Sequence, residues 1–256
     1  YRGAFNNLES PSMASVAVKA AVDRSGIDPK EVDDCIMGAA IQQGTQGFNL
    51  GRQVAMASGL PVSVAGMTID RQCSSGLMTI ATGAKHIIND NAPITIAGGC
   101  ESISLVQNEH MNSHRIGDPL TIKNAPMIHM PMLDTAETVA KRYNISREAQ
   151  DEYAVASQER TADAQVRGAF DNEIVPVTAI KMIMNKETGE VTKEEVTLTK
   201  DEGNRPGTTI ENLANLKPVR NDGTITAGNA SQLSDGAAAV VMLSLIHISE
   251  PTRPSS

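Results

Sequence analysis

This sequence has few aromatic residues, few cysteines and no excess of basic charge. Of its 256 residues, 2% are aromatic and none is Trp, so the core must be built from Ala, Val, Ile, Leu and Met. Lys and Arg number 22 against 30 Asp and Glu, which argues against a nucleic-acid-binding surface. The longest apolar run, AAAVVMLSLIHI, is too short to cross a bilayer. We therefore expect neither nucleic acid nor a membrane as a partner.

The number and spacing of the cysteines indicate the compartment of the protein. Cys35, Cys73 and Cys100 are odd in number, lie far apart and form no CxxC pair. This argues against a disulfide framework or a zinc ribbon and favours a reducing compartment. The segment before the first predicted helix lacks the charged stretch followed by an apolar stretch that a secretory signal has. We therefore expect a cytoplasmic protein.

Other common site patterns are missing as well. The sequence holds no GxGxxG and no Walker A string, so nothing supports a dinucleotide or nucleoside triphosphate site. His110 and His114 stand four residues apart, but HMNSH lacks the glutamate of HExxH. A solvated loop is therefore favoured there over a metal site. We expect no metal and no cofactor.

Apolar strands alternate with helical patterns in the first part of the chain, which predicts an α/β domain with a buried, largely parallel sheet. Beyond it the pattern changes, because residues 107–131 have no clean period. We expect a core over 1–105 and 232–243, interrupted by an inserted subdomain. The predicted core helices are 10–26, 49–59 and 75–88, and the predicted core strands are 33–41, 64–70 and 92–100. The predicted later elements are helices 133–143, 146–170 and 209–219, a hairpin over 181–200 turning near Gly189, and strand, turn and strand over 223–243.

The string DRQCSSG lies where a predicted strand passes into a predicted helix, and it contains Cys73. The first N–H groups of a helix have no intrahelical partner, and the helix dipole is positive there. Both effects favour a thiolate at this place. The small residues that follow leave room for an acyl group and let backbone N–H groups approach an oxyanion. The pattern resembles a nucleophile elbow, against the alternative of a buried inert thiol. The same weighing favours core packing for Cys35 in a strand and for Cys100 at a strand end.

Several long blocks resemble the thiolase family. VAGMTIDRQCSSGLMTIATGAKHI resembles the nucleophile segment, and AGGCESIS the strand and turn after it. TAETVAKRYNISREAQDEYAVASQERTADAQ resembles the helical part of the loop domain, and LKPV with GTITAGNASQLSDGAAAVV the return to the core. The resemblance covers residues 1–243 as one N-terminal domain, with core 1–105 and 232–243 and an inserted helical and hairpin loop domain over 106–231. It implies a layered α/β fold with a mixed, largely parallel sheet.

The resemblance also implies an activity. Thiolases cleave a 3-oxoacyl-CoA with CoA to acetyl-CoA and a shortened acyl-CoA, or run the reverse condensation. The cysteine matching Cys73 would carry the acyl group as a thioester, which splits one hard step into two easier ones. Acyl-CoA and CoA would be substrates, so no separate cofactor is implied. Family members are oligomers, so a homo-oligomer is expected.

The resemblance assigns CoA contacts to the loop domain. Ser231 matches a serine near the pantetheine, Ala227 an alanine of the same wall, and Met132 a methionine of the acyl pocket. Pro131 stands where acetoacetyl-CoA-type thiolases have histidine, and Arg220 where they have phenylalanine. These departures favour a broader 3-ketoacyl-CoA thiolase.

Three family motifs do not occur in this sequence: Gly-His-Pro, Cys-x-Gly-Gly-Gly and Asn-Glu-Ala-Phe. We therefore expect an N-terminal half that does not turn over by itself, followed by a tail over 244–256 outside the family pattern. Two alternatives remain. One is a CoA-binding or dimerising half-domain without chemistry. The other is a ketoacyl synthase or thioesterase, against which the NASQLSDGAAA block argues.

Overall fold

The structure is a computed structural model that describes residues 3–245. The chain divides into two units, each described by itself below. Unit 1 comprises residues 3–112, 175–200 and 233–245, and unit 2 comprises residues 113–174 and 201–232. From position 246 onward, the predicted tail lies outside the described residues.

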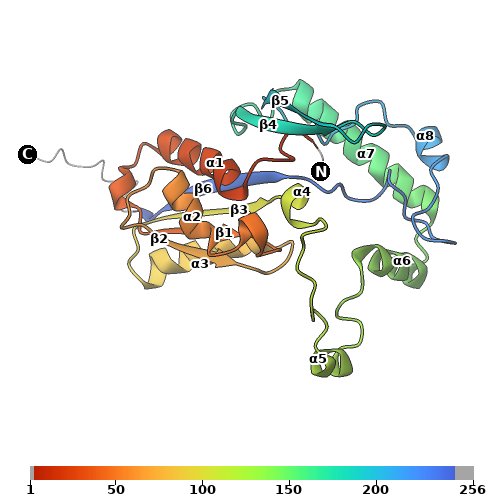
Figure 1. The fold of residues 1–256 in the computed structure, drawn as a ribbon, viewed down its shortest axis with the longest axis horizontal. Coiled ribbons are helices and arrows are strands. Elements are labelled where there is room, and N and C mark those ends of the chain that lie inside the picture. The colour runs from red at the N-terminus through yellow and green to blue at the C-terminus, as the bar shows by residue number, and fades with distance from the viewer. Residues whose placement is uncertain (1–2, 246–256) are drawn as a thin grey trace, which may run out of the picture. The chain divides into compact units, whose positions relative to one another are not determined.

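Unit 1 is built on a four-stranded sheet in the order β2-β1-β3-β6 (Figure 1). β1 pairs in parallel with both β2 and β3, whereas β6 runs antiparallel to β3. The predicted mixed, largely parallel sheet is therefore confirmed. The strands are β1 (Asp34–Gly38), β2 (Ala65–Ile69), β3 (Ile94–Glu101) and β6 (Gly236–Leu243).

Helices cover both faces of this sheet. α1 packs on β3 and β6, α2 packs on β1 and β2, and the two helices contact each other. α3 packs on β1 and β3 from the opposite face (Figure 1). This three-layer arrangement follows from the period-2 alternation of β3, which sends Ile96 to one face and Thr95 to the other. The helices are α1 (Ser10–Ser25), α2 (Leu50–Ala57), α3 (Ser75–Asn89) and the short α4 (Ile103–Val106), with 3-10 turns η1 (Pro29–Glu31) and η2 (Gly44–Gln46).

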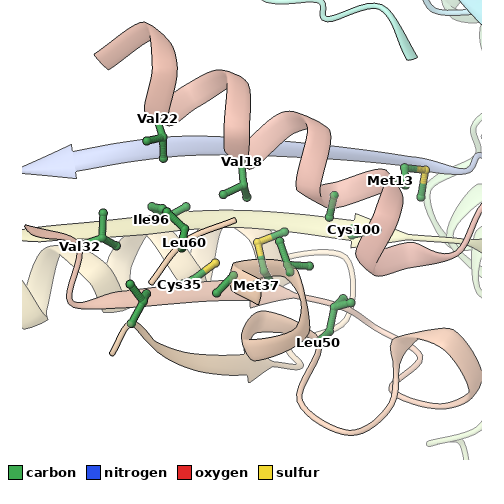
Figure 2. Packing of buried hydrophobic residues seen from close by; sticks show 14 of the residues in the cluster. Met13, Val18, Val22, Val32, Cys35, Met37, Leu50, Leu60, Ile96 and Cys100 are labelled. Carbon is green, nitrogen blue, oxygen red and sulfur yellow. The ribbon is translucent and has the colours of Figure 1, made fainter. Parts of the chain in front are cut away.

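The main core lies between the sheet and the α1–α2 layer (Figure 2). It contains no aromatic side chain among its buried members, as the composition predicts. Aliphatic and sulfur-containing side chains interdigitate there and supply the main driving force for folding. Its central members are Met13, Val18, Val22, Cys35, Met37, Leu50, Val54, Ile94, Ile96 and Cys100.

α1 ends as the sequence predicts but begins differently. Gly26 takes a left-handed conformation with φ 70°, which ends the helix at little steric cost. Ser10, predicted as the N-cap, is instead the first helical residue, and Glu9 is the N-cap. The cause is tertiary, because the Ser10 N–H donates to Thr45 Oγ1 at 2.9 Å. A hydroxyl from η2 thus satisfies the N–H of the first helical residue, which has no partner within the helix.

The predicted hairpin is formed by β4 (Val177–Met184) and β5 (Val191–Leu198), with Gly189 at φ 73° in its turn. It begins four residues earlier than predicted. The sequence assigns it to the inserted domain, whereas in the structure it belongs to unit 1. Asn6 explains this difference. Its Nδ2 donates to Met182 O at 2.7 Å and its Oδ1 accepts from Met182 N at 2.9 Å, as a neighbouring strand would.

Unit 2 is helical. Ser146 caps α7 as predicted, since its Oγ accepts from Ala149 N at 3.2 Å. The expected loop over 107–131 contains one short helix, and the strand expected at the start of 223–243 is absent. There the N–H groups of Thr224 and Ile225 donate to the Glu137 carboxylate instead of to a strand. The helices are α5 (Pro119–Asn124), α6 (Met132–Tyr143), α7 (Arg147–Val166) and α8 (Ile210–Ala214).

Candidate active site

The carboxyl ends of three parallel strands meet at one edge of the unit 1 sheet, where α/β proteins commonly bind ligands. Gly38, Ile69 and Glu101 end these strands. Cys73 lies in the turn that leaves β2 at this edge and enters α3 at Ser75. The predicted strand, turn and helix around Cys73 are therefore confirmed.

The turn that carries Cys73 is held by hydrogen bonds from its own polar residues. Asp70 Oδ1 accepts from the N–H of Gln72 at 2.8 Å. Ser74 Oγ donates to the carbonyl of Arg71 at 2.8 Å, and Ser75 Oγ donates to that of Gln72 at 2.6 Å. Gln72 has φ 51°, a left-handed conformation that is unfavourable for a residue with a side chain. The nucleophile elbow has such a constrained turn.

A close approach of backbones fixes where α3 begins. A Cβ placed on Gly38 would lie 2.7 Å from the carbonyl carbon of Ser75, closer than real Cβ contacts come. The first turn of α3 can therefore pack directly on the end of β1 only because residue 38 is glycine. The role of Gly38 was not among the sequence-based predictions. A glycine at the end of an apolar strand, in CIMGAA, was the signal for such an approach.

The same edge contains a polar network that the sequence analysis also missed. The Glu101 carboxylate accepts from Ala40 N at 2.8 Å and from Gln46 Nε2 at 2.5 Å. Gln46 is fully buried, and its Oε1 accepts from Ser102 N at 2.5 Å. These bonds hold the segment after β1 against the end of β3. Sequence alone offered only the charged residue at the end of AGGCE as a signal.

The three cysteines differ sharply in environment. Cys73 is exposed, whereas Cys35 and Cys100 are 0% and 4% exposed. Burial raises the pKa of the Cys35 thiol to about 12 and does the same for Cys100, whose Sγ lies 3.6 Å from Ser10 O. Core packing of Cys35 and Cys100 is therefore confirmed. Cys73 is the cysteine that can meet a substrate.

The three predicted CoA-contact residues lie in unit 2 and are exposed: Met132 begins α6, and Ala227 and Ser231 lie in the segment after residue 223. Asn229 holds that segment in a tight turn. Its Oδ1 accepts from Thr226 N at 2.7 Å, and its Nδ2 donates to Asp151 of α7 at 2.9 Å. Ala227 and Ser231 thus flank one anchored turn. Their contacts with CoA remain predictions.

Glu137 of α6 anchors the same segment from the other side. Its carboxylate accepts from Thr224 N at 2.9 Å, from Thr224 Oγ1 at 3.1 Å and from Ile225 N at 2.8 Å. Desolvation raises the pKa of Glu137, but these hydrogen bonds outweigh it and leave the pKa below its usual range. The carboxylate is therefore the favoured form. It fixes the backbone of Thr224 and Ile225, just before the turn that contains Ala227.

The two departures from the acetoacetyl-CoA pattern also lie in unit 2. Pro131 is the N-cap residue of α6. Arg220 Nε donates to Asp134 Oδ1 at 2.6 Å, and this hydrogen bond and charge lower the pKa of Asp134. The guanidinium is thus held by a carboxylate in the first turn of α6.

Two further features of the chain concern metal binding and membrane insertion. His110 and His114 do not lie on a helix, and His110 Nε2 lies 3.8 Å from Glu109 Oε1 at the surface. Within the described residues, no three His, Cys, Asp or Glu side chains gather as a metal site would require. Over residues 3–245, no helix combines the length and apolarity needed to cross a membrane.

Taken together, the fold and this edge define an α/β domain that presents a cysteine at a constrained turn between a strand and a helix. The model of the thiolase N-terminal domain matches residues 1–245. The chain belongs to the thiolase family.

Relatives agree with this assignment. The chain is 39% identical to a 3-ketoacyl-CoA thiolase of Bacillus subtilis, over 94% of this chain and 61% of that protein. It is 41% identical to a peroxisomal 3-ketoacyl-CoA thiolase of Homo sapiens, over 94% of this chain and 55% of that protein. A crystal structure of the Bacillus anthracis acetyl-CoA acetyltransferase matches with 36% identity and a TM-score of 0.80, over 99% of this chain and 64% of that one. The chain thus spans about 60% of the length of these relatives.

Proposed function

We propose that this chain is the acyl-accepting part of a thiolase-type acyltransferase and that Cys73 carries the acyl group. One observation carries the proposal: Cys73 is exposed in the turn entering α3, while the other two cysteines are buried. The N-terminus of α3 supplies positive dipole potential there, and the backbone N–H groups of its first turn point toward that end. Both favour a thiolate nucleophile and stabilise charge developing on a carbonyl oxygen.

The reaction divides into two steps. In the first, Cys73 Sγ attacks the 3-oxo carbon of a 3-oxoacyl-CoA, and the bond between carbons 2 and 3 breaks. The acyl group stays on Cys73 as a thioester, and the thiol proton ends on the methyl carbon of the released acetyl-CoA. In the second step the thiol of another CoA attacks this thioester, and its proton returns to Cys73 as the shortened acyl-CoA leaves.

Acylation of Cys73 is the step that can be measured with this chain alone. The resemblance assigns proton transfer to histidine and cysteine motifs that do not occur in these 256 residues. We therefore expect a stable acyl adduct and no turnover from the chain alone. Incubation with acetyl-CoA followed by peptide mass spectrometry should find acetyl on Cys73. Acetylation spread evenly over Cys35, Cys73 and Cys100, or unchanged in total by Cys73→Ala, would overturn the proposal.

We further propose that unit 2 binds CoA through the anchored turn that contains Ala227 and Ser231, with Met132 lining the acyl pocket. Both turn residues are exposed, and Asn229 fixes the backbone between them. Calorimetric titration with CoA tests this. Because CoA is anionic, Ser231→Asp should weaken binding about tenfold or more through charge repulsion. Ser157→Asp places the same charge on an exposed position of α7 and should leave binding unchanged. Equal effects of both variants would contradict the assignment.

For substrate range, we propose a broader set of 3-ketoacyl-CoA substrates than acetoacetyl-CoA alone. Arg220 and Pro131 support this, because neither can make the contacts that phenylalanine and histidine make in acetoacetyl-CoA-type members. The test compares acylation of Cys73 by 3-oxohexanoyl-CoA and by acetoacetyl-CoA at equal concentration. Labelling by acetoacetyl-CoA but not by 3-oxohexanoyl-CoA would reject the broader range.

A second candidate function is a dimerising half-domain without chemistry. β2 is an edge strand of the unit 1 sheet, and Phe48 beside it is 100% exposed. Asn49 connects the two, donating from Nδ2 to Gly66 O at 2.8 Å. An unpaired strand edge with an exposed aromatic neighbour favours self-association. Sedimentation should show dimers that Phe48→Asp dissociates, whereas Val166→Asp, on α7, should not. A monomeric wild type would reject this candidate.

The location of the protein stays a prediction. The sequence predicts the cytoplasm, whereas the names of the human relative and of two mouse relatives place those proteins in peroxisomes.

A further inference from the structure

One buried hydroxyl bridges the two residues that precede Cys73. Ser75 is 5% exposed, and its Oγ accepts from Arg71 N at 2.9 Å and donates to Gln72 O at 2.6 Å. The Ser75 N–H also donates to Gln72 O, at 3.0 Å. Ser75 therefore contributes three hydrogen bonds to the turn, two of which converge on a single carbonyl.

That carbonyl belongs to the peptide unit joining Gln72 to Cys73. A peptide unit is planar, so fixing the direction of its C=O also fixes the position of the next Cα. Gln72 has φ 51°, which a residue with a side chain adopts only when its surroundings impose it. Asp70 and Ser74 hold the peptide unit before Gln72, and the hydrogen bonds from Ser75 hold the carbonyl that follows it, so Ser75 completes the set of bonds that keeps this conformation.

We propose that Ser75 is a positioning residue for Cys73. By holding Gln72 in the left-handed conformation, its hydroxyl directs the thiol of Cys73 out of the turn and beside the N-terminus of α3. This inference rests on the proposed acyl-carrying role of Cys73. Ser75 does not touch the substrate itself, since its hydroxyl is buried and occupied by two backbone groups.

The inference predicts a particular pattern among four variants of the full chain. Ser75→Ala removes both side-chain bonds and should slow alkylation of Cys73 by iodoacetamide about tenfold, with a changed pH–rate profile. Ser75→Thr keeps the hydroxyl and should retain most of the rate. Ser58→Ala is the matched control. Its Oγ also donates to a backbone carbonyl, Val54 O at 2.6 Å, but at the end of α2, so the rate and profile should not change.

The fourth variant separates positioning from general stability. Glycine adopts positive φ freely, so with Gln72→Gly this conformation should no longer depend on the hydrogen bonds from the Ser75 hydroxyl. Adding Gln72→Gly to Ser75→Ala should therefore restore the alkylation rate of Cys73. Urea unfolding of each variant gives the folded fraction, to which the rates are normalised. If Ser75→Ala alkylates like Ser58→Ala after normalisation, or if Gln72→Gly fails to restore the rate, the positioning role is overturned.

A separate experiment tests whether Cys73 carries the acyl group, and its result is independent of the alkylation rates. Alkylation by iodoacetamide needs no CoA site, so the four variants decide the role of Ser75 by themselves. Acetyl-CoA labelling of the wild type decides the role of Cys73. A wild type that is alkylated at Cys73 but never acetylated would reject the proposed function and leave the effect of Ser75 measurable.

Discussion

Gly38 at the end of β1 and Ser75 at the start of α3 are in backbone contact, with no room for a Cβ between them. This contact sets the height of the first turn of α3 above the sheet and therefore the position of the Cys73 turn. Gly38→Ala should destabilise the chain by about 1–3 kcal/mol, because the helix has to move. It should also slow alkylation of Cys73. Urea unfolding and iodoacetamide kinetics measure the two effects.

Gly76, the next residue of α3, supplies the control for that prediction. A Cβ at Gly76 would meet nothing within 4 Å. Gly76→Ala should therefore keep or raise the free energy of unfolding, by up to about 1 kcal/mol from helix propensity. Equal destabilisation by alanine at both glycines would contradict the role assigned to the Gly38 contact.

Labelling of the native protein should be selective for one cysteine. At about pH 8, near the ordinary pKa of a thiol, iodoacetamide should modify Cys73 alone. Burial raises the pKa of both Cys35 and Cys100 to about 12 and removes them from the reagent. All three should react in guanidinium chloride. Modification of Cys35 or Cys100 in the folded protein, detected by peptide mass spectrometry, would contradict the described core.

Asp34 should make stability fall as pH rises. Burial raises its pKa, and the attraction of His86, whose Nδ1 lies 3.7 Å from Asp34 Oδ2, offsets this only in part. A raised pKa means that the folded state holds its proton more tightly than the unfolded state. This favours folding at low pH and is lost as the pH rises through the folded pKa.

Asp34→Asn tests that sign. The variant should be more stable than wild type at about pH 7, and its advantage should shrink as the pH falls through the raised folded pKa of Asp34 and be gone below about 3.9, the ordinary pKa of Asp. Asp23→Asn, on the exposed face of α1, is the control and should give a much smaller difference. An advantage of Asp34→Asn that grows toward acid pH would show the opposite sign.

Glu137 should stabilise unit 2 in the opposite pH direction. Its pKa is lowered in the folded state, so its contribution is present above about pH 4.3, the ordinary pKa of Glu, and is lost as pH falls through the folded value. Glu137→Ala should expose the N–H groups of Thr224 and Ile225 to faster hydrogen exchange at neutral pH. It should also weaken CoA binding, because Ala227 lies two residues after Ile225. Exchange that stays unchanged at these two amides would contradict the anchoring role.

Local patterns predicted much of this molecule. The strand, turn and helix around Cys73, the cap at Ser146 and the end of α1 at Gly26 all depend on residues within a few positions of each other, so they are legible along the chain. The cap predicted at Ser10 and the strand predicted after residue 223 were wrong for one reason. In each case a side chain distant in sequence accepts a backbone hydrogen bond. Thr45 accepts from the N–H of Ser10, and Glu137 accepts from that of Thr224.

The sequence by itself determined the α/β class, the strand, turn and helix around Cys73 and the membership of the thiolase family, because periodicity, turn chemistry and long motif blocks are properties of contiguous residues. The tertiary structure alone decided three things: that Gly38 must be glycine, that the β4–β5 hairpin joins unit 1 through Asn6, and that Ser75 clamps Gln72. Each is a contact made only once the chain has folded. Its energy depends on distances between atoms whose approach no local pattern specifies.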